Sequence, residues 1–493
     1  MHSSAWIDVM LCVPALGAVA AAMAKRAAYA VAVVTGLALA GVTTVVVVLY
    51  NSHAAGGFDF ATRHVLAAPF GLAYDVGVDG LSLLMVALTT IVLLLALWGA
   101  RERARESSFV TWLLVLTAVS LGAFVSRDLL EFFVFFELTL VPGYFLVAGW
   151  GGRERARAAL TFFVYTFAGS AFLFVGLLYL AVLHQHQAGG AITFADAALR
   201  ATAMSHSTAV WIFAAFAIAF FVKSPVFPLH TWSPLTYAEA PTAGSVELSG
   251  VLAKLGSYGL LRFAVGLLPG AMGDVRPWVM TLAVVSIVYA SGLACVTPDL
   301  KRLVAYSSMA QMGFITLGVV SGNKVAVAGA VLLMFNHGVI TAGLFLLVGF
   351  VQRRRGTASI AALTGLQGAA PVLAGLFTVV MMASIGLPGL SGFVSEFLVL
   401  IGTFAVHPWW ALAAATGVVL AALYLLWAFQ RVFQGRADGD NATLADATRA
   451  ERWVMVPVVV LVVALGVFPR PALDRITPSV SPGYTAPVTG VAK

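Results

Sequence analysis

Apolar runs of about 20 residues recur from one end of this chain to the other, and each could cross the hydrocarbon core of a bilayer as a helix. Only 10% of the 493 residues are charged and 61% are hydrophobic, whereas about a quarter of an ordinary soluble domain is charged. A surface this apolar is not compatible with water, so it must face lipid. The sequence therefore predicts an all-α polytopic membrane protein with one continuous membrane domain, residues 1–493.

The runs predict about 14 transmembrane helices, because a helix rising 1.5 Å per residue needs about 20 residues to span the core. We place them at 6–24, 27–50, 79–99, 109–126, 129–149, 159–183, 209–229, 242–267, 277–297, 302–320, 324–351, 371–404, 409–433 and 453–468. Residues 1–100 hold three N-terminal helices, 109–267 and 277–433 hold five each, and a short tail, 469–493, follows the last. The longer polar connections are 51–78 and 184–208.

Basic residues are distributed unequally between the two sides of the membrane. Loops after odd-numbered spans carry about twice as many Lys and Arg residues as all other loops and ends together, and such loops face the cytoplasm. The sequence therefore predicts a multi-pass protein of a bacterial plasma (inner) membrane with both termini on the outer, periplasmic side. Arg101 to Arg105 and Arg353 to Arg355 are interpreted as topology determinants rather than as a binding site.

Several classes of function are excluded by what the sequence lacks. The two cysteines, Cys12 and Cys295, lie far apart in apolar runs, so no iron–sulfur, zinc or disulfide framework is predicted. No glycine-rich phosphate loop or dinucleotide-binding motif is found. The net charge of +7 comes from short loops, which gives no support for a nucleic-acid partner. We expect no cofactor and no metal in this chain.

Two predicted spans are interrupted by helix-breaking residues. Span seven ends in a segment with Pro225 and Pro228, and span twelve contains Gly386-Leu-Pro388-Gly389. Proline removes a backbone donor and breaks the helical hydrogen-bond ladder. The breaks lie five spans apart, and a second copy of a five-helix unit must enter the membrane upside down. The pattern therefore predicts two inverted five-helix repeats with discontinuous helices 7 and 12, as in ion-coupled transporters; a packing kink is the alternative for either break alone.

Two of the six lysines lie at mid-span, although this chain otherwise prefers arginine. Lys223 is in span seven and Lys254 in span eight, each near the centre of the bilayer. Lysine can release its proton when it is desolvated, whereas arginine cannot. A site that must take up and release a proton needs lysine at such a position. The alternative is a static buried ion pair that holds helices together.

Glu137, in span five, is the predicted partner of Lys223. A carboxylate at that depth is costly and pairs with a cation or stays protonated. At a separation of about 4 Å and an effective dielectric constant near 20, their attraction is about 4 kcal/mol. Moving one charge against roughly 200 mV costs about 4.6 kcal/mol. Making and breaking this pair could therefore drive one proton step. Glu239, before span eight, is expected to be solvated or to cap a helix.

Four further buried groups are candidates for the same path. His337 is at mid-span and can titrate near neutral pH. Glu396 follows the break in span twelve and is expected to face the cavity that the break opens. His230 follows the two prolines of span seven. Glu247 is seven residues before Lys254, hence on the same face of an ideal helix, and could pair with it.

A series of motifs resembles one specific family. The series is Phe227-Pro-Leu-His-Thr-Trp232, Glu239-Ala-Pro-Thr-Ala-Gly-Ser245, Gly250-Val-Leu-Ala-Lys254-Leu-Gly, Asp299-Leu-Lys-Arg-Leu-Val-Ala-Tyr-Ser-Ser308 and Gly386-Leu-Pro-Gly. Together these resemble the antiporter-like subunit family that includes subunit M of bacterial NADH:quinone oxidoreductase (respiratory complex I) and subunits of multisubunit cation/proton antiporters. The resemblance covers roughly 110–430.

The resemblance implies a proton-translocating membrane subunit with two inverted half-channels. By motif match it assigns Glu137 and Lys223 to the first half-channel, Lys254 to the centre, His337 to the central relay and Glu396 to the exit. It also implies neighbouring antiporter-like membrane subunits in a complex I-like assembly. NADH, FMN, iron–sulfur clusters and quinone would then be bound by partner subunits, and quinone reduction elsewhere would drive the protons.

This chain departs from the family pattern at three places on the expected path, one of which is Glu247, where relatives usually carry an aliphatic residue. Gln311 stands where relatives usually carry a titratable group, so water is expected to bridge that point. Ser233-Pro-Leu-Thr-Tyr237 replaces a segment that usually holds an acid and a histidine. Two other interpretations remain open: a subunit of a cation/proton antiporter or membrane-bound hydrogenase complex, and an assembly scaffold without transport.

Overall fold

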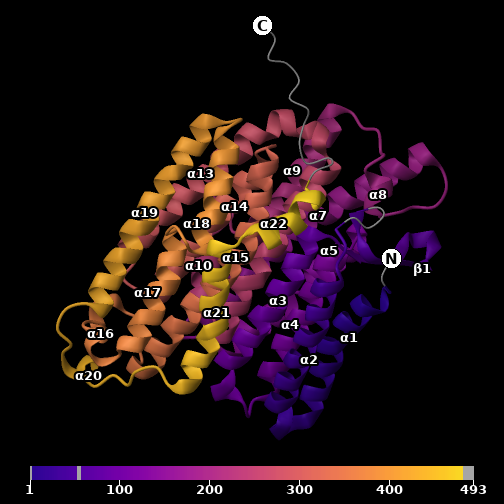
Figure 1. The fold of residues 1–493 in the computed structure, drawn as a ribbon. Helices are drawn as coiled ribbons and strands as arrows, with labels where there is room; N and C mark the ends of the chain where they lie inside the picture. The colour runs from indigo at the N-terminus through magenta and orange to yellow at the C-terminus, as the bar shows by residue number, and fades with distance from the viewer. Residues whose placement is uncertain (1–2, 53–56, 481–493) are drawn as a thin grey trace.

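The computed structural model describes residues 3–52 and 57–480, and most of them form helices that run roughly side by side (Figure 1). Within these residues, 11 helical segments are long and apolar enough to cross a membrane. The N-terminal and C-terminal halves of the chain occupy opposite ends of an elongated body, with α21 (Arg449–Val467) between them in the view of Figure 1. The coarse prediction of a helical membrane protein is confirmed; the end of the predicted tail, 481–493, lies outside the described residues.

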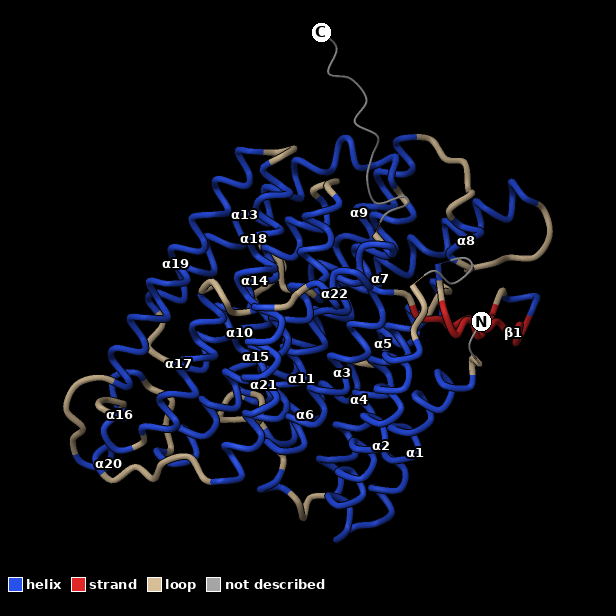
Figure 2. Tube along the Cα trace, in the orientation of Figure 1, coloured by secondary structure: helices blue, strands red, loops and turns tan. Residues whose placement is uncertain are grey.

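The N-terminal region contains α1 (Ala5–Ala24), α2 (Ala28–Leu49) and α3 (Gly80–Gly99) as predicted, but the connection before α3 was not foreseen. There β1 (Asp59–Ala67) pairs antiparallel with β2 (Leu72–Val78), so an all-α description is wrong for this segment. Figure 2 shows the hairpin at one edge of the helical body. Gly71 turns the hairpin at a φ of 67°, a conformation that glycine adopts without strain. A long hydropathy window averages over such short strands and misses them.

The next helices form the first half of the transmembrane body. They are α4 (Ser107–Val125), α5 (Leu129–Leu138), α6 (Leu140–Trp150), α7 (Arg155–Ala188), α8 (Asp196–Leu199), α9 (His206–Lys223) and α10 (Trp232–Glu239). Helical structure stops at Lys223 and resumes at Trp232, around Pro225 and Pro228, where the sequence predicted a break. The end of α9 therefore lies in the interior of the helical body.

Two irregularities in this half were not predicted. The helix of span five is interrupted at Thr139, because Pro142 has no N–H to offer the carbonyl of Leu138. Span eight is divided into α11 (Thr242–Glu247), the π-helix η5 (Leu248–Leu252), α12 (Ala253–Gly259) and a second π-helix, η6 (Leu260–Val265). π-helical turns within α-helices are rare and often occur at functional sites.

The second half also contains a broken helix. It contains α13 (Met272–Val296), α14 (Leu300–Val320), α15 (Lys324–Arg355), α16 (Leu366–Ala369), α17 (Pro371–Ile385), α18 (Ser391–Phe404), α19 (Pro408–Phe433), α20 (Gly439–Ala442), α21 and α22 (Arg470–Ser479). The break between α17 and α18 uses Gly386 and Gly389, with φ values of 82° and 91°, on either side of Pro388. The segment expected only to be a tail contributes α22, which packs on α3 and α15.

Helix α15 is the axis of the molecule. Its most apolar stretch of 18 residues is completely buried. The helix contacts α3 and α11 from the first half and α14, α17, α18 and α21 from the second. Polar side chains in the middle of α15 therefore lie inside the protein rather than in lipid. This places the middle of α15 between the two broken helices.

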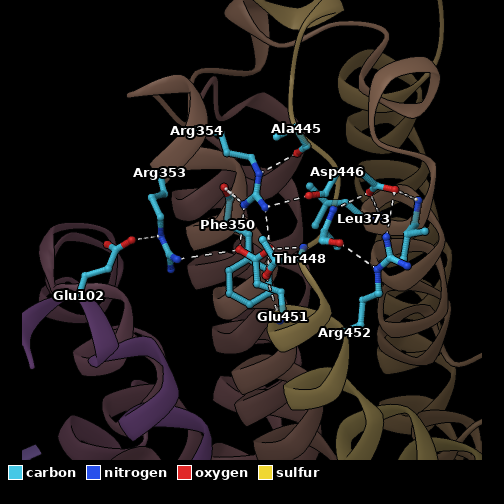
Figure 3. Close-up of polar contacts among 12 residues, drawn as sticks. Glu102, Phe350, Arg353, Arg354, Leu373, Ala445, Asp446, Thr448, Glu451 and Arg452 are labelled. Carbon is cyan, nitrogen blue, oxygen red and sulfur yellow. Dashed lines mark hydrogen bonds and ion pairs between the residues drawn. The ribbon is translucent and has the colours of Figure 1, made fainter.

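A charged cluster fixes the end of α15 to the start of α21 (Figure 3). The guanidinium of Arg354 donates to both carboxylate oxygens of Glu451 at 2.9 and 2.6 Å, and Arg353 pairs with Glu102 at 2.8 Å. Burial acts to raise the pKa of Asp446, but hydrogen bonds from backbone N–H groups, with that of Leu373 at 2.9 Å, outweigh it and hold the pKa below its usual value. Arg353 and Arg354, which the sequence predicted to be topology determinants, therefore also form specific ion pairs within the protein.

Candidate functional site

Lys223 is buried at the end of α9 and points at the break between α5 and α6. Its Nζ donates to the hydroxyl of Thr139 at 2.7 Å and lies 4.5 Å from the ring centroid of Phe136. The side chain is 1% exposed. A cation held by a hydroxyl and an aromatic face is only partly compensated for the water it has lost. The amine therefore occupies a site in which loss of its proton is not opposed by a bound carboxylate.

Glu137 lies on α5, the helix that is interrupted at Thr139, but it does not contact Lys223. In the described residues no ion pair within 4.0 Å joins the two, so the close approach assumed from sequence is not made. The reason is the break at Thr139, which brings a hydroxyl rather than the carboxylate to the amine. Glu137 is half-buried, its Oε1 has no hydrogen-bond partner, and Ser170 of α7 bonds its side chain.

Hydroxyl groups connect the position of Lys223 to that of Lys254. The Ser224 hydroxyl donates to the carbonyl of Ala253 at 3.1 Å and lies 3.1 Å from the hydroxyl of Ser257. The residue after Lys223 therefore bonds the residue before Lys254. The two lysines lie on directly bonded turns of neighbouring helices, one at the end of α9 and one in α12.

Lys254 is fully buried, and its Nζ donates to the carbonyl of Ser249 at 2.5 Å. That carbonyl lies in η5, where the π-helical geometry leaves it accessible to a side chain. The predicted pairing of Lys254 with Glu247 is not formed in the described residues. Spacing of seven places two residues on one face only at about 100° per residue, and the wider π turns between them rotate the two side chains apart.

His337 projects from the buried middle of α15 and interacts electrostatically with Lys254. Among the described residues, neither ring nitrogen has a hydrogen-bond partner. The preceding residue, Asn336, donates to the carbonyl of Ser391 at 2.9 Å and to the hydroxyl of Ser395 at 3.3 Å. The pair Asn336-His337 thus connects α12 in the first half to α18 in the second.

Glu396 is buried on α18 and receives a hydrogen bond from Gln311 of α14 at 2.7 Å. Its Oε2 lies on the inner side of the α17–α18 break, 3.0 Å from where a Cβ on Gly386 would be. The amide of Gln311 contacts the carboxylate directly, and the water bridge expected at this point stays a prediction. Gln311 therefore orients Glu396 without taking a proton itself.

His230 lies apart from this series, against a polar cavity of about 350 Å³ that Glu154, Arg157, Arg302 and Tyr306 also line. Its ring packs on Tyr289, with centroids 5.3 Å apart, and its Nδ1 has no partner.

The divergent segment after Trp232 is packed rather than open. The Ser233 hydroxyl donates to the carbonyl of His230 at 3.1 Å, and the Tyr237 hydroxyl donates to that of Leu248 at 3.4 Å. The carboxylate of Glu239 accepts a hydrogen bond from the N–H of Glu154, just before α7, at 3.0 Å.

Several polar contacts of the site were missed by reasoning from sequence. They involve Thr139, Ser224, Ser257, Asn336 and Lys301. Asn336 could have been found from the sequence, because it is a polar neighbour of a buried histidine. Thr139, Ser224 and Ser257 could not, since small hydroxyl residues bond backbone carbonyls in many membrane helices. In the part of the chain that the structure describes, no group of three His, Cys, Asp or Glu residues could hold a metal ion.

Known proteins are similar to this chain in sequence and in fold. A family model described as "NADH:quinone oxidoreductase/Mrp antiporter, TM" matches residues 126–423, which hold every candidate site residue. The chain belongs to this family. It is 40% identical to NADH-quinone oxidoreductase subunit M of Rhodobacter capsulatus over 425 residues, 83% of this chain and 82% of that relative.

Chains of solved structures have a fold similar to that of this protein. A chain of respiratory complex I from Thermus thermophilus with bound NADH has a TM-score of 0.87 and 31% identity, over 96% of this chain and 99% of that one. A chain of the Mrp complex from Dietzia sp. DQ12-45-1b has a TM-score of 0.84 over 97% of each chain, at 20% identity. The second likeness concerns the fold alone.

Proposed function

We propose that this chain is a proton-translocating, antiporter-like membrane subunit of an NADH:quinone oxidoreductase, in which quinone reduction by partner subunits drives protons through buried Glu, Lys and His side chains. One observation carries the proposal. Buried titratable groups extend across both halves of the fold, from Lys223 through Lys254 and His337 to Glu396, on helices that polar side chains connect. Such groups are costly within a membrane and are retained where charge moves.

Each group has a proposed role that follows from its place in the series. Glu137 sets the charge near Lys223 in the first half-channel, and Lys223 exchanges its proton with Lys254 across the Ser224–Ser257 contact. Lys254 passes the proton to the unprotonated ring nitrogen of neutral His337, which is not occupied by a hydrogen bond to another described residue. Glu396 releases it beside the α17–α18 break, held in place by Gln311. His230 lines an entry cavity.

The finer fold is part of the proposal. The 45-residue segment Ala5–Leu49 contains two helices, and the divided spans 242–265 and 371–404 each add one crossing to the long helices, which supports 14 transmembrane helices. Breaks after α9 and α17 support two inverted repeats. The distribution of basic loops supports a bacterial inner-membrane location with both termini on the periplasmic side.

Redox chemistry belongs to the partners in this proposal. NADH, FMN, iron–sulfur clusters and quinone are bound by other subunits, and neighbouring antiporter-like subunits pack beside this one in the membrane. The chain contributes to the oxidoreductase as a translocase, through proton transfer alone.

The proposal is tested by purifying the chain from its native membranes with an affinity tag and identifying its partners by mass spectrometry. We expect flavin- and iron–sulfur-containing subunits to be recovered, and the preparation to oxidise NADH with quinone and acidify the outside of reconstituted vesicles. Recovery of small antiporter subunits, with cation-driven proton exchange and no NADH oxidation, would contradict the proposal in favour of a cation/proton antiporter.

A further inference from the structure

A second polar cavity opens on the side of the molecule that we assign to the cytoplasm, away from His230. It has a volume of about 320 Å³ and lies where the C-terminal ends of α3, α6, α10 and α15 meet the starts of α11 and α14. Its polar lining includes Glu102, Glu239, Thr242, Lys301, Gln352 and Arg353. The Nζ of Lys301 donates to the carbonyl of Ala240 and thereby fixes the junction of α10 and α11. The cavity thus ends at the first residues of the helix that leads to Lys254.

Glu247 lies below this cavity on the same helix. It is five residues past Thr242, or about 7.5 Å deeper at 1.5 Å per residue, and it is fully buried. In the part of the chain that the structure describes, neither carboxylate oxygen has a hydrogen-bond partner and no cation pairs with the group. An isolated carboxylate in such surroundings is too costly to stay ionised, so the group rests as a neutral acid. A neutral acid carries a proton that it can donate.

The segment between Glu247 and Lys254 is the π-helix η5. The two groups lie seven residues apart in the sequence. The carbonyl of Ser249 lies between them and already binds the amine of Lys254 at 2.5 Å. The Ser249 hydroxyl donates to the carbonyl of Ser245 at 2.7 Å, so it adds a second polar group to this stretch. The path from cavity to lysine therefore runs along one helix.

We propose that Glu247 is a proton donor that reloads Lys254 from the cytoplasmic cavity, by a route that does not use Glu137 or Lys223. The step converts the neutral acid and the neutral amine into a carboxylate and an ammonium, through water between them. Glu247 then takes a proton from water in the cavity. This inference rests on the proposed function, since it requires Lys254 to give up a proton during turnover.

The test uses the whole reconstituted complex and measures protons pumped per NADH oxidised. The Glu247→Gln variant keeps the shape of the side chain but cannot donate a proton to the amine. We expect its pumping ratio to fall to that of Lys254→Met, while NADH oxidation and assembly stay at wild-type levels. Glu247→Asp should recover part of the loss, and Asp440→Asn, at an exposed carboxylate, should change nothing.

The infrared band of a protonated carboxyl group gives a second measurement. We expect one such band to be present in the resting complex, to shift during turnover and to be missing from Glu247→Gln. If Glu247→Gln pumps normally while Lys254→Met does not, Glu247 is a packing residue and only this inference fails. If Lys254→Met also pumps normally, the proposed function fails with it.

Discussion

Replacing Lys223 with arginine is expected to stop proton pumping through this subunit while leaving the complex assembled. Arginine keeps the positive charge and can reach the hydroxyl of Thr139, which Lys223 contacts at 2.7 Å. It cannot release a proton inside a protein. A static cation that holds α9 to α5 would therefore tolerate the change, whereas a proton carrier would not. The two interpretations of the buried lysine make opposite predictions for this one substitution.

The measurement is the number of protons pumped per NADH oxidised by reconstituted vesicles. Lys223→Ala should lose pumping as Lys223→Arg does, and both should retain subunit composition on native gels. Lys324→Arg is the matched control, because that lysine is exposed at the start of α15. Unchanged pumping in Lys223→Arg would favour the assembly scaffold without transport.

The Glu451→Ala variant is expected to weaken the attachment of α21 by about 1–3 kcal/mol, because the largely buried Arg354 loses its carboxylate partner and keeps only backbone carbonyls as acceptors. Glu451 is 3% exposed and accepts from both terminal nitrogens of Arg354 (Figure 3). It also forms a capping box with Thr448 at the start of α21. The change should lower the melting temperature of the purified complex and expose 434–448 to protease.

Glu154→Ala is the control for that experiment. Glu154 pairs with Arg157 at 3.2 Å, but both side chains are largely exposed, and such pairs contribute about 1 kcal/mol or less. Equal melting temperatures for the two variants would show that the cluster at the end of α15 is not structurally important.

Long-range features of the fold followed from the sequence where the physical signal was strong. Apolar runs predicted the long helices. Pro225 and Pro228 predicted the break after Lys223, and the segment Gly386-Leu-Pro388-Gly389 predicted the second break. The break at Thr139 was missed although Pro142 could have indicated it, because a single proline in a membrane helix is often tolerated. The hairpin β1–β2 and α22 were missed because each is shorter than the window that a membrane span requires.

The site could be predicted as a set of residues but not as a set of contacts. Lysine at mid-span drew attention to Lys223 and Lys254 for a chemical reason that holds in any fold. Which group each amine meets depends on local geometry: the turn at Thr139 keeps Glu137 away from Lys223, and η5 rotates Glu247 away from Lys254. Helical spacing rules assume regular helices, and both failures occur where the helix is irregular.

The protonation state of the Lys254 side chain during turnover decides whether buried amines move protons in this protein. Solid-state ¹⁵N NMR of the complex, labelled on lysine Nζ and assigned by subtracting the Lys254→Met spectrum, distinguishes an ammonium from a neutral amine. We predict that the Lys254 signal differs between the resting complex and the complex oxidising NADH, with the amine form present in one of them. An ammonium signal that is identical in both states would contradict the account.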